Sequence, residues 1–333
     1  MSLLNSPIKV EHLELKNRLV MPPMATSKAN EKGEVTEQIC NYYNEKSVGG
    51  YIGLIITEHS YVSIEGKAGK GQMSIANDSD IDGLKRLTDL IHKNGSTVFA
   101  QISHAGAAAN SEVTGKTVLG ASTIKMPQFK EVPTAMTLQD IKKVINDFVN
   151  DAVRAKKAGF DGVEIHSAHG YLLNQFYSPL TNKRTDEYGI GTMYSRLRLH
   201  TEIVKAVRNL VGEDYPIALR LGACDYMEGG ATLQDGVEAA KILEQAGIDL
   251  LDISGGFCGT IRPGATEEGY FQELTEAIKK AVTIPVILTG GITESRSAEK
   301  LLKDNKADLI GVGRAILKNS SWAKEAILSV QGE

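Results

Sequence analysis

The amino-acid sequence predicts an α/β protein with a (β/α)8 TIM-barrel fold, and three observations support this fold class. Eight short apolar runs of β type recur along the 333 residues. Each run is continuous rather than alternating, as in parallel strands that are covered on both faces. Amphipathic helical patterns lie between many of the runs, and the order helix end, turn, aspartate and strand recurs in KKAGFDGVEI, EQAGIDLLDI and DNKADLIGV. Strands that alternate with helices in this way are typical of a barrel of parallel strands.

The eight predicted strands each end in small or polar residues. In chain order they cover residues 18–24, 51–60, 96–106, 159–170, 216–224, 248–256, 284–292 and 307–316. A short hairpin, IKVEHLELKNR, precedes the first strand, and we expect it to cap the barrel floor. The loops at 107–136 and 172–198, after the third and fourth strands, are too long for simple helical returns. Long loops after strands carry the active site of a barrel.

Three helices are predicted from apolar stripes at helical spacing, at 137–159, 232–247 and 294–305. Thr137 and Thr232 are suited to cap the first two, and a glycine ends each of them. No linker rich in Pro, Ser or Gly divides the chain, so we expect one domain over residues 1–333. The alternative, a doubly wound open sheet, is disfavoured because no G-x-G-x-x-G follows the first strand.

Composition excludes several classes of protein. The net charge is −4 without a sustained basic stripe, which argues against nucleic acid as a partner. No run of about 18 apolar residues predicts a membrane span, and the N-terminus lacks the features of a signal peptide. Cys40, Cys224 and Cys258 are far apart and odd in number, which favours a reducing, cytoplasmic location and excludes a four-cysteine metal site within one chain. A small-molecule substrate is the expected partner.

Chemically active side chains collect where the predicted strands end, which is where a barrel places its catalytic groups. An arginine within an apolar strand needs an anionic partner, and for Arg220 we favour a ligand over a structural ion pair. The stretch EIHSAHGYL brings two histidines and a tyrosine together at the end of the fourth strand. The side chains at strand ends are those of His59, Gln101, His104, His166, His169, Arg220 and Asp225.

A phosphate site is predicted after the seventh and eighth strands. TGG at 289–291 and GVGR at 311–314 let backbone N–H groups approach an anion, and Arg314 adds positive charge. Barrels commonly bind phosphate at this place. The residues therefore indicate a phosphorylated ligand that lies across the barrel mouth. An isomerase or lyase of a phosphorylated substrate would use the same loops, and a hydrolase with a histidine-bound metal is a further alternative.

Six stretches carry a resemblance to the Old Yellow Enzyme family of FMN-dependent NAD(P)H oxidoreductases, or ene-reductases. Together they span the barrel, and the chain is most similar in layout to the short bacterial, single-barrel branch of the family. The stretches are NRLVMPPM (17–24), AQISHAG (100–106), VEIHSAHGYLLNQFYSPLTNKRTDEYG (163–189), ALRLGACD (218–225), LTGG (288–291) and IGVGRAIL (310–317).

The resemblance implies FMN at the barrel mouth, with NADPH or NADH as reductant and no metal. The flavin phosphate would contact Gly290, Gly291, Gly313 and Arg314. The flavin ring would contact Pro23, Met24, Ala25, His59, Gln101 and Arg220. Arg220 would face the N1/O2 region, where a guanidinium stabilises the reduced flavin. Ala25 stands where short relatives often carry a cysteine and yeast-type relatives a threonine.

The resemblance also implies the reaction. Activated C=C bonds of α,β-unsaturated carbonyls, and also quinones or nitro compounds, would be reduced in a ping-pong cycle. His166 and His169 would bind the carbonyl oxygen as negative charge builds on it. Tyr171 would supply the proton, since a tyrosine with an unperturbed pKa of about 10 is protonated at neutral pH. The family resemblance implies a homo-oligomer, dimer or tetramer, and we expect neither the iron–sulfur cluster nor the extra domains of long relatives.

Overall fold

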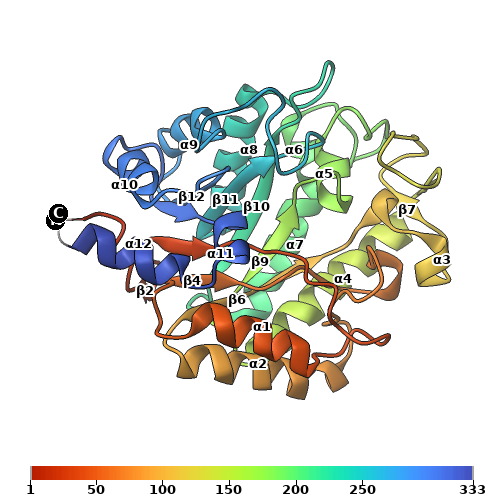
Figure 1. Cartoon of the computed structure of the whole chain (residues 1–333). Coiled ribbons are helices and arrows are strands. Elements are labelled where there is room, and N and C mark those ends of the chain that lie inside the picture. Colours follow the sequence, from red (N-terminus) through yellow and green to blue (C-terminus); the bar gives the residue numbers. More distant parts are fainter. Residues whose placement is uncertain (1, 332–333) are drawn as a thin grey trace.

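A closed barrel of eight parallel strands forms the centre of the structure, a computed structural model that describes residues 2–331. Each strand pairs with its two neighbours, and pairing of β4 with β6 closes the ring. All eight predicted strands and the predicted fold class are confirmed (Figure 1). The barrel strands are β3 (Leu19–Met21), β4 (Leu54–Ile56), β6 (Thr97–Ser103), β9 (Gly162–Ser167), β10 (Ile217–Cys224), β11 (Leu250–Gly255), β12 (Val286–Thr289) and β13 (Leu309–Gly311).

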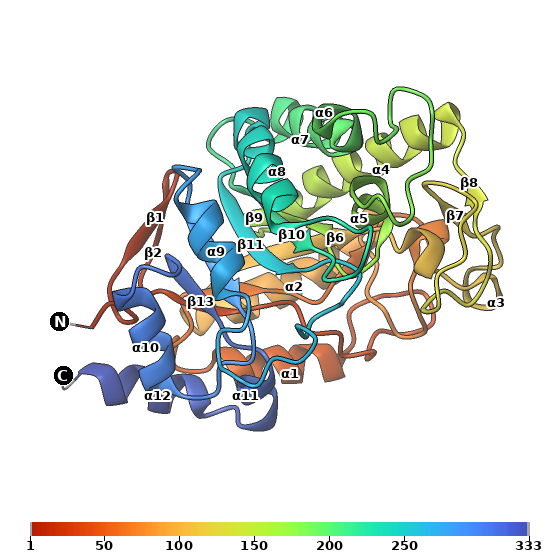
Figure 2. The same cartoon turned by 90° about the horizontal axis from the view of Figure 1, so that it is seen from above.

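Helices cover the outside of the barrel (Figures 1 and 2). The three predicted helices are confirmed as α4 (Leu138–Lys157), α8 (Leu233–Ala246) and α10 (Ser295–Lys303), and Thr137 and Thr232 cap the first two through capping boxes. The remaining long helices are α1 (Glu37–Ser47), α2 (Ile81–Lys93), α7 (Arg198–Val211), α9 (Gln272–Lys279) and α12 (Trp322–Gln331), and a short α11 (Arg314–Lys318) follows β13. Among residues 2–331, no helix is both long and apolar enough to cross a membrane.

The N-terminal hairpin closes the barrel floor, as the sequence predicted. It consists of β1 (Ile8–Val10) and β2 (Leu13–Leu15), which pair antiparallel. Val10 and Leu15 are fully buried against side chains from the lower part of the barrel interior. Those side chains are Val20, Leu54, Ile56, Phe99, Ala218, Leu250, Ile287 and Leu309. An apolar layer thus seals this end, so polar chemistry is confined to the opposite end.

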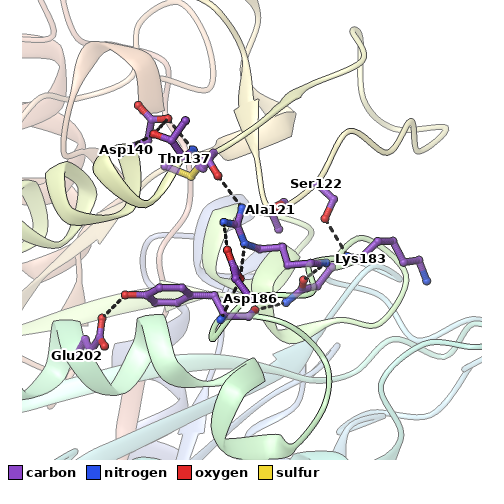
Figure 3. A network of polar contacts seen from close by, with 11 residues as sticks. Ala121, Ser122, Thr137, Asp140, Lys183, Asp186 and Glu202 are labelled. Carbon is purple, nitrogen blue, oxygen red and sulfur yellow. Dashed lines mark hydrogen bonds and ion pairs between the residues drawn. The ribbon is translucent and has the colours of Figure 1, made fainter.

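The two long loops after β6 and β9 contain short elements of their own. The first loop has two short helices, η3 (Gly106–Ala108) and α3 (Ser111–Thr114), and a small sheet of β7 (Leu119–Gly120) and β8 (Thr134–Ala135). The second contains α5 (Leu172–Tyr177) and α6 (Met193–Arg196). A polar network joins the two loops, and Figure 3 shows Lys183 and Asp186 beside Ala121 and Ser122. Three further short elements are β5 (Ser60–Tyr61), η1 (Ile64–Gly66) and η2 (Asp78–Asp80).

Candidate active site

A polar layer lies in the barrel above the apolar floor. Side chains alternate across a strand, so residues two apart from the floor positions also point inward. Gln101 and Glu164 are register partners on β6 and β9, and Arg220 and Asp252 are register partners on β10 and β11. Gln101 Nε2 donates to Glu164 Oε1 at 2.7 Å, and Thr289 Oγ1 donates to Asp252 Oδ1 at 3.3 Å. This layer holds two carboxylates and one guanidinium.

Arg220 has a protein partner that the sequence analysis did not identify. Its Nε lies 3.2 Å from Asp252 Oδ2, and both side chains are at least 95% buried. The two atoms are within ion-pair distance, but neither forms an aligned hydrogen bond, and Glu164 Oε2 has no partner either. The arginine therefore forms the structural ion pair that the sequence analysis disfavoured, and its side chain also lines a cavity that is open to a ligand.

Burial and charge together raise the pKa values of both carboxyl groups in this layer. Burial is the main cause for Glu164, the nearby Asp252 charge adds to it, and Arg220 opposes it, so that the pKa of Glu164 rises to about 8. The pKa of Asp252 is also raised by burial and is opposed by Arg220. Because both pKa values are raised, the two carboxyl groups do not both carry a charge at neutral pH.

Replacement of Glu164 by glutamine is expected to weaken the pH dependence of stability. A carboxyl whose pKa is raised on folding favours the folded state below its unfolded pKa, about 4.3, and loses that contribution as pH rises toward the folded value. The free energy of unfolding of the wild-type protein should therefore fall between about pH 4.3 and 8, and that of Glu164→Gln should fall less over the same range. Urea unfolding at several pH values measures this. Equal declines in the two proteins would contradict the assignment, and the exposed Glu228→Gln is the control.

Four aromatic side chains meet above the polar layer at the C-terminal ends of β4 and β9. The ring centroids of His166 and Tyr171 are 4.9 Å apart, those of His166 and His169 are 5.2 Å apart, and those of His59 and Tyr171 are 5.6 Å apart. Tyr171 Oη lies 3.3 Å from His59 Nε2. The structure thus joins the predicted cluster of His166, His169 and Tyr171 to a histidine from a distant strand.

Burial keeps these side chains uncharged. It is the main cause of the lowered pKa of His166 and of His169, which are both well below the usual histidine range, and Arg220 lowers both further. Burial and Arg220 lower the pKa of His59 to about 4. Burial raises the pKa of Tyr171 to about 12, so the expectation of an unperturbed tyrosine is wrong in value, although the phenol is still protonated at neutral pH.

The hydrogen bonds of the two histidines restrict where their single protons lie. His166 Nδ1 accepts from the Ala168 N–H at 3.4 Å, so the proton of this neutral ring lies on Nε2, which can donate to a ligand. His169 has a positive φ of 57°, and its Nε2 lies 2.8 Å from the Ser254 hydroxyl of β11. Ser254 therefore fixes the orientation of the His169 ring.

A cavity of about 820 Å³, including its open mouth, lies beside Arg220. Seven of the residues predicted to bind a cofactor line it. They are Pro23, Met24, Ala25, Arg220, Gly291, Gly313 and Arg314. Tyr270, whose hydroxyl accepts from Arg314 Nη2 at 3.1 Å, also lines the cavity and was missed by the sequence analysis.

The remaining predicted residues lie near this cavity but do not line it. Gly290 is adjacent, and its carbonyl accepts from the Tyr270 N–H at 3.2 Å. Gln101 lies in the polar layer, and His59 lies in the aromatic cluster. Arg220 lies between the cavity and the aromatic cluster. Its side chain lines the cavity, and its charge lowers the pKa of all three histidines in the cluster.

A buried glutamate holds the segment that lines one edge of the cavity. Glu58 accepts hydrogen bonds from the Thr26 N–H at 2.8 Å and from the Thr26 hydroxyl at 2.7 Å, directly after Ala25.

The sequence analysis missed Glu58, Glu164, Asp252 and Ser254. Period-two counting from His166 along its own strand could have found Glu164, whereas Asp252 and Ser254 lie on β11 and could be placed only by the strand register. The two remaining strand-end residues are satisfied internally, His104 by the Gly106 N–H and Asp225 by Ser178 and two backbone N–H groups.

No group of three or more His, Cys, Asp or Glu side chains within residues 2–331 is arranged to hold a metal ion. The hydrolase alternative therefore has no ligand set in the described chain. The polar groups instead converge on a cavity lined by Arg220 and Arg314 and on a neutral aromatic cluster at the C-terminal mouth of the barrel. The fold and the site together define a barrel enzyme of the kind that binds a phosphorylated ligand.

The chain belongs to the NADH:flavin oxidoreductase / NADH oxidase family, whose model matches residues 3–329. It is 40% identical over 331 residues to an NADH oxidase of Thermoanaerobacter brockii, covering 98% of this chain but 50% of that protein. It is 39% identical over 322 residues to an NADPH dehydrogenase of Halalkalibacterium halodurans, covering 96% and 93%. The Old Yellow Enzyme homologue of Zymomonas mobilis superposes with a TM-score of 0.86 at 28% identity, covering 98% and 92%. The chain thus spans about half the length of some curated relatives and nearly all of others.

Family membership implies FMN as cofactor and NAD(P)H as reductant, and the residues that line the cavity suit FMN. Arg314 and the glycines at 291 and 313 lie at the same cavity and suit a phosphate. Arg220 supplies a buried cation at the wall of the cavity, which suits the electron-rich edge of a flavin. A Cβ on Gly313 would lie 3.2 Å from Met24 Sδ, so a larger residue there would crowd the wall of the cavity.

Proposed function

We propose that the protein is an FMN-dependent NAD(P)H oxidoreductase that reduces activated C=C bonds, principally those of α,β-unsaturated carbonyl compounds. The observation that carries this proposal is the neutral cluster of His166, His169 and Tyr171 beside a cavity suited to FMN. When bound, FMN supplies the hydride chemistry. The residues at the phosphate loops, Gly290, Gly291, Gly313 and Arg314, would hold its phosphate.

The ring of FMN would contact Pro23, Met24, Ala25, His59, Gln101 and Arg220. Arg220 would stabilise negative charge on the ring edge, since its side chain lines the cavity. Asp252 fixes the direction of that guanidinium from the other side. Gln101 is oriented by Glu164, so its amide is presented in one defined way.

His166 and His169 would hold the carbonyl oxygen of the substrate. Their lowered pKa values leave each ring one N–H at neutral pH, and the Nε2–H of His166 is free to donate. Charge that develops on the oxygen strengthens these hydrogen bonds most in the transition state. Neutral donors also avoid placing two further positive charges next to Arg220.

Tyr171 would give its proton to the α-carbon of the substrate. Its pKa of about 12 keeps the phenol protonated across the physiological range. His59, 3.3 Å from the phenol oxygen, orients the hydroxyl. Quinones and nitro compounds would be alternative acceptors, because the site asks for an electron-poor π system with an oxygen atom for the histidines. In the same proposal the protein acts in the cytoplasm as a homo-oligomer.

The visible absorption spectrum of the purified protein tests the cofactor, with any chromophore released by heat and identified. An oxidised-flavin spectrum with about one FMN per chain is expected from a cavity of this composition. The bound flavin should then be bleached by NADPH or NADH and restored by an enone. A colourless protein that takes up no added FMN would contradict the proposed function and favour the alternative, an isomerase or lyase of a phosphorylated substrate.

A further inference from the structure

The loop after β6 folds over the turn that carries His169 and Tyr171. Met126 and Phe129 of this loop pack with Ala107 and with Phe257, which follows β11, in a small cluster separate from the main core. The Phe129 and Phe257 ring centroids are 6.1 Å apart. A Cβ on Gly170 would lie 3.2 Å from a ring carbon of Phe257 and 3.7 Å from the amide of Gln128. The apolar cluster therefore lies against the turn between the two predicted catalytic residues.

One arginine from the neighbouring loop holds both ends of this covering segment. Arg184 Nη1 donates to the Ala121 carbonyl at 3.1 Å and to the Met136 carbonyl at 2.6 Å. Next to it, the Lys183 N–H donates to Ser122 Oγ at 2.8 Å (Figure 3). Residues 121–136 are thus fastened at their two ends to the segment TNKRTDEYG, which the proposed mechanism does not use.

The guanidinium is itself held in position. It forms a bidentate pair with Asp186, at 3.0 and 2.5 Å, which Figure 3 shows in the same network. It also lies over the ring of Phe176, 5.8 Å from the centroid, and Phe176 belongs to the helix that begins after Tyr171. The Arg184 side chain is only 9% exposed. The planar guanidinium of an arginine is required at this position, because it contacts two carbonyl groups, a carboxylate and an aromatic ring at the same time.

We propose that Arg184 is a positioning residue that holds residues 121–136 over the His166, His169 and Tyr171 cluster. In this position the cluster of Met126, Phe129 and Phe257 packs against Gly170 and holds the turn, so that the hydroxyl of Tyr171 is kept where the substrate needs its proton. The inference rests on the proposed function for its substrate, but the fastening of the segment can be measured without turnover.

The test compares Arg184→Met with wild type in two measurements. Hydrogen–deuterium exchange of the FMN-loaded protein should become about tenfold faster within 121–136, since charged hydrogen bonds that close the segment are lost. In steady-state kinetics, kcat for an enone should fall about tenfold, whereas kcat for a quinone, whose protons come from water, should change little. A general loss of stability would affect both substrates alike.

Arg198→Met is the matched control, because Arg198 lies over Tyr188 and pairs with Glu202 without contacting the segment. Arg184→Lys should give an intermediate result, because one ammonium group cannot form all the hydrogen bonds of the guanidinium. If Arg184→Met fails to fold, Asp186→Asn removes the partner carboxylate and should change both measurements in the same direction. Unchanged exchange, or equal losses of kcat with the enone and the quinone, overturns the proposal. If Arg184→Met shows the expected faster exchange but the wild-type protein reduces no enone, the proposed function is refuted instead.

Discussion

Replacement of Tyr171 by phenylalanine is expected to lower kcat for enone reduction by about 10²–10⁴-fold, the usual contribution of a general acid. The ring and its contacts with His166 remain, so substrate binding should change little. Reduction of a quinone should be nearly unaffected, because its protons go to oxygen atoms that water can reach. Because the pKa of Tyr171 is about 12, wild-type enone reduction should also persist to high pH without loss of this proton.

Steady-state kinetics with an enone and a quinone measure this difference. Tyr194→Phe is the control, since Tyr194 is 65% exposed and lies on α6, away from the cluster. Equal losses with both acceptors would mean that Tyr171 supports binding or folding rather than proton transfer. An enone rate within threefold of wild type would remove the tyrosine from the proposed mechanism.

Replacement of Arg220 by methionine is expected to cost about 3–5 kcal/mol in free energy of unfolding and to abolish stoichiometric FMN binding. Asp252 is fully buried and would lose its cation, and Glu164 would lose the charge that opposes its raised pKa. Denaturant unfolding and the FMN content of the purified protein are the two measurements.

The double variant Arg220→Met with Asp252→Asn separates the two effects. It removes the uncompensated carboxylate, so stability should largely recover, whereas FMN binding should remain weak because the cavity still lacks its cation. Arg262→Met is the control: Arg262 pairs with Glu267 and Glu273 at 3.5 and 3.6 Å and is 31% exposed, so a loss of less than about 1 kcal/mol is expected. A single Arg220→Met variant as stable as wild type would show that the ion pair contributes nothing.

The order of strands and helices could be predicted because it follows from local periodicity. A continuous apolar run such as IALRLG can be recognised as a strand without its neighbours, and Thr137 or Thr232 identifies a helix start by its own chemistry. The position of His166, His169 and Tyr171 at the end of a strand follows in the same way. Once a barrel is assumed, strand ends converge, so the phosphate loops at 289–291 and 311–314 were also predictable.

Contacts between side chains from distant strands could not be read from the sequence. His59 meets Tyr171 across 112 positions, Arg220 faces Asp252, and Arg184 reaches Ala121 and Met136. These pairings depend on strand register and on closure of the ring between β4 and β6, which no local pattern encodes.

The sequence by itself therefore determined the fold class, the strand order and which residue types reach the barrel mouth, since periodicity and strand ends are local properties. Only the tertiary structure decided the charge state of the site. The pKa values of Glu164, His166 and Tyr171 shift because closure of the barrel removes water from them and sets Arg220 among them. Desolvation and charge proximity are properties of the packed interior, and they exist only after the chain has folded.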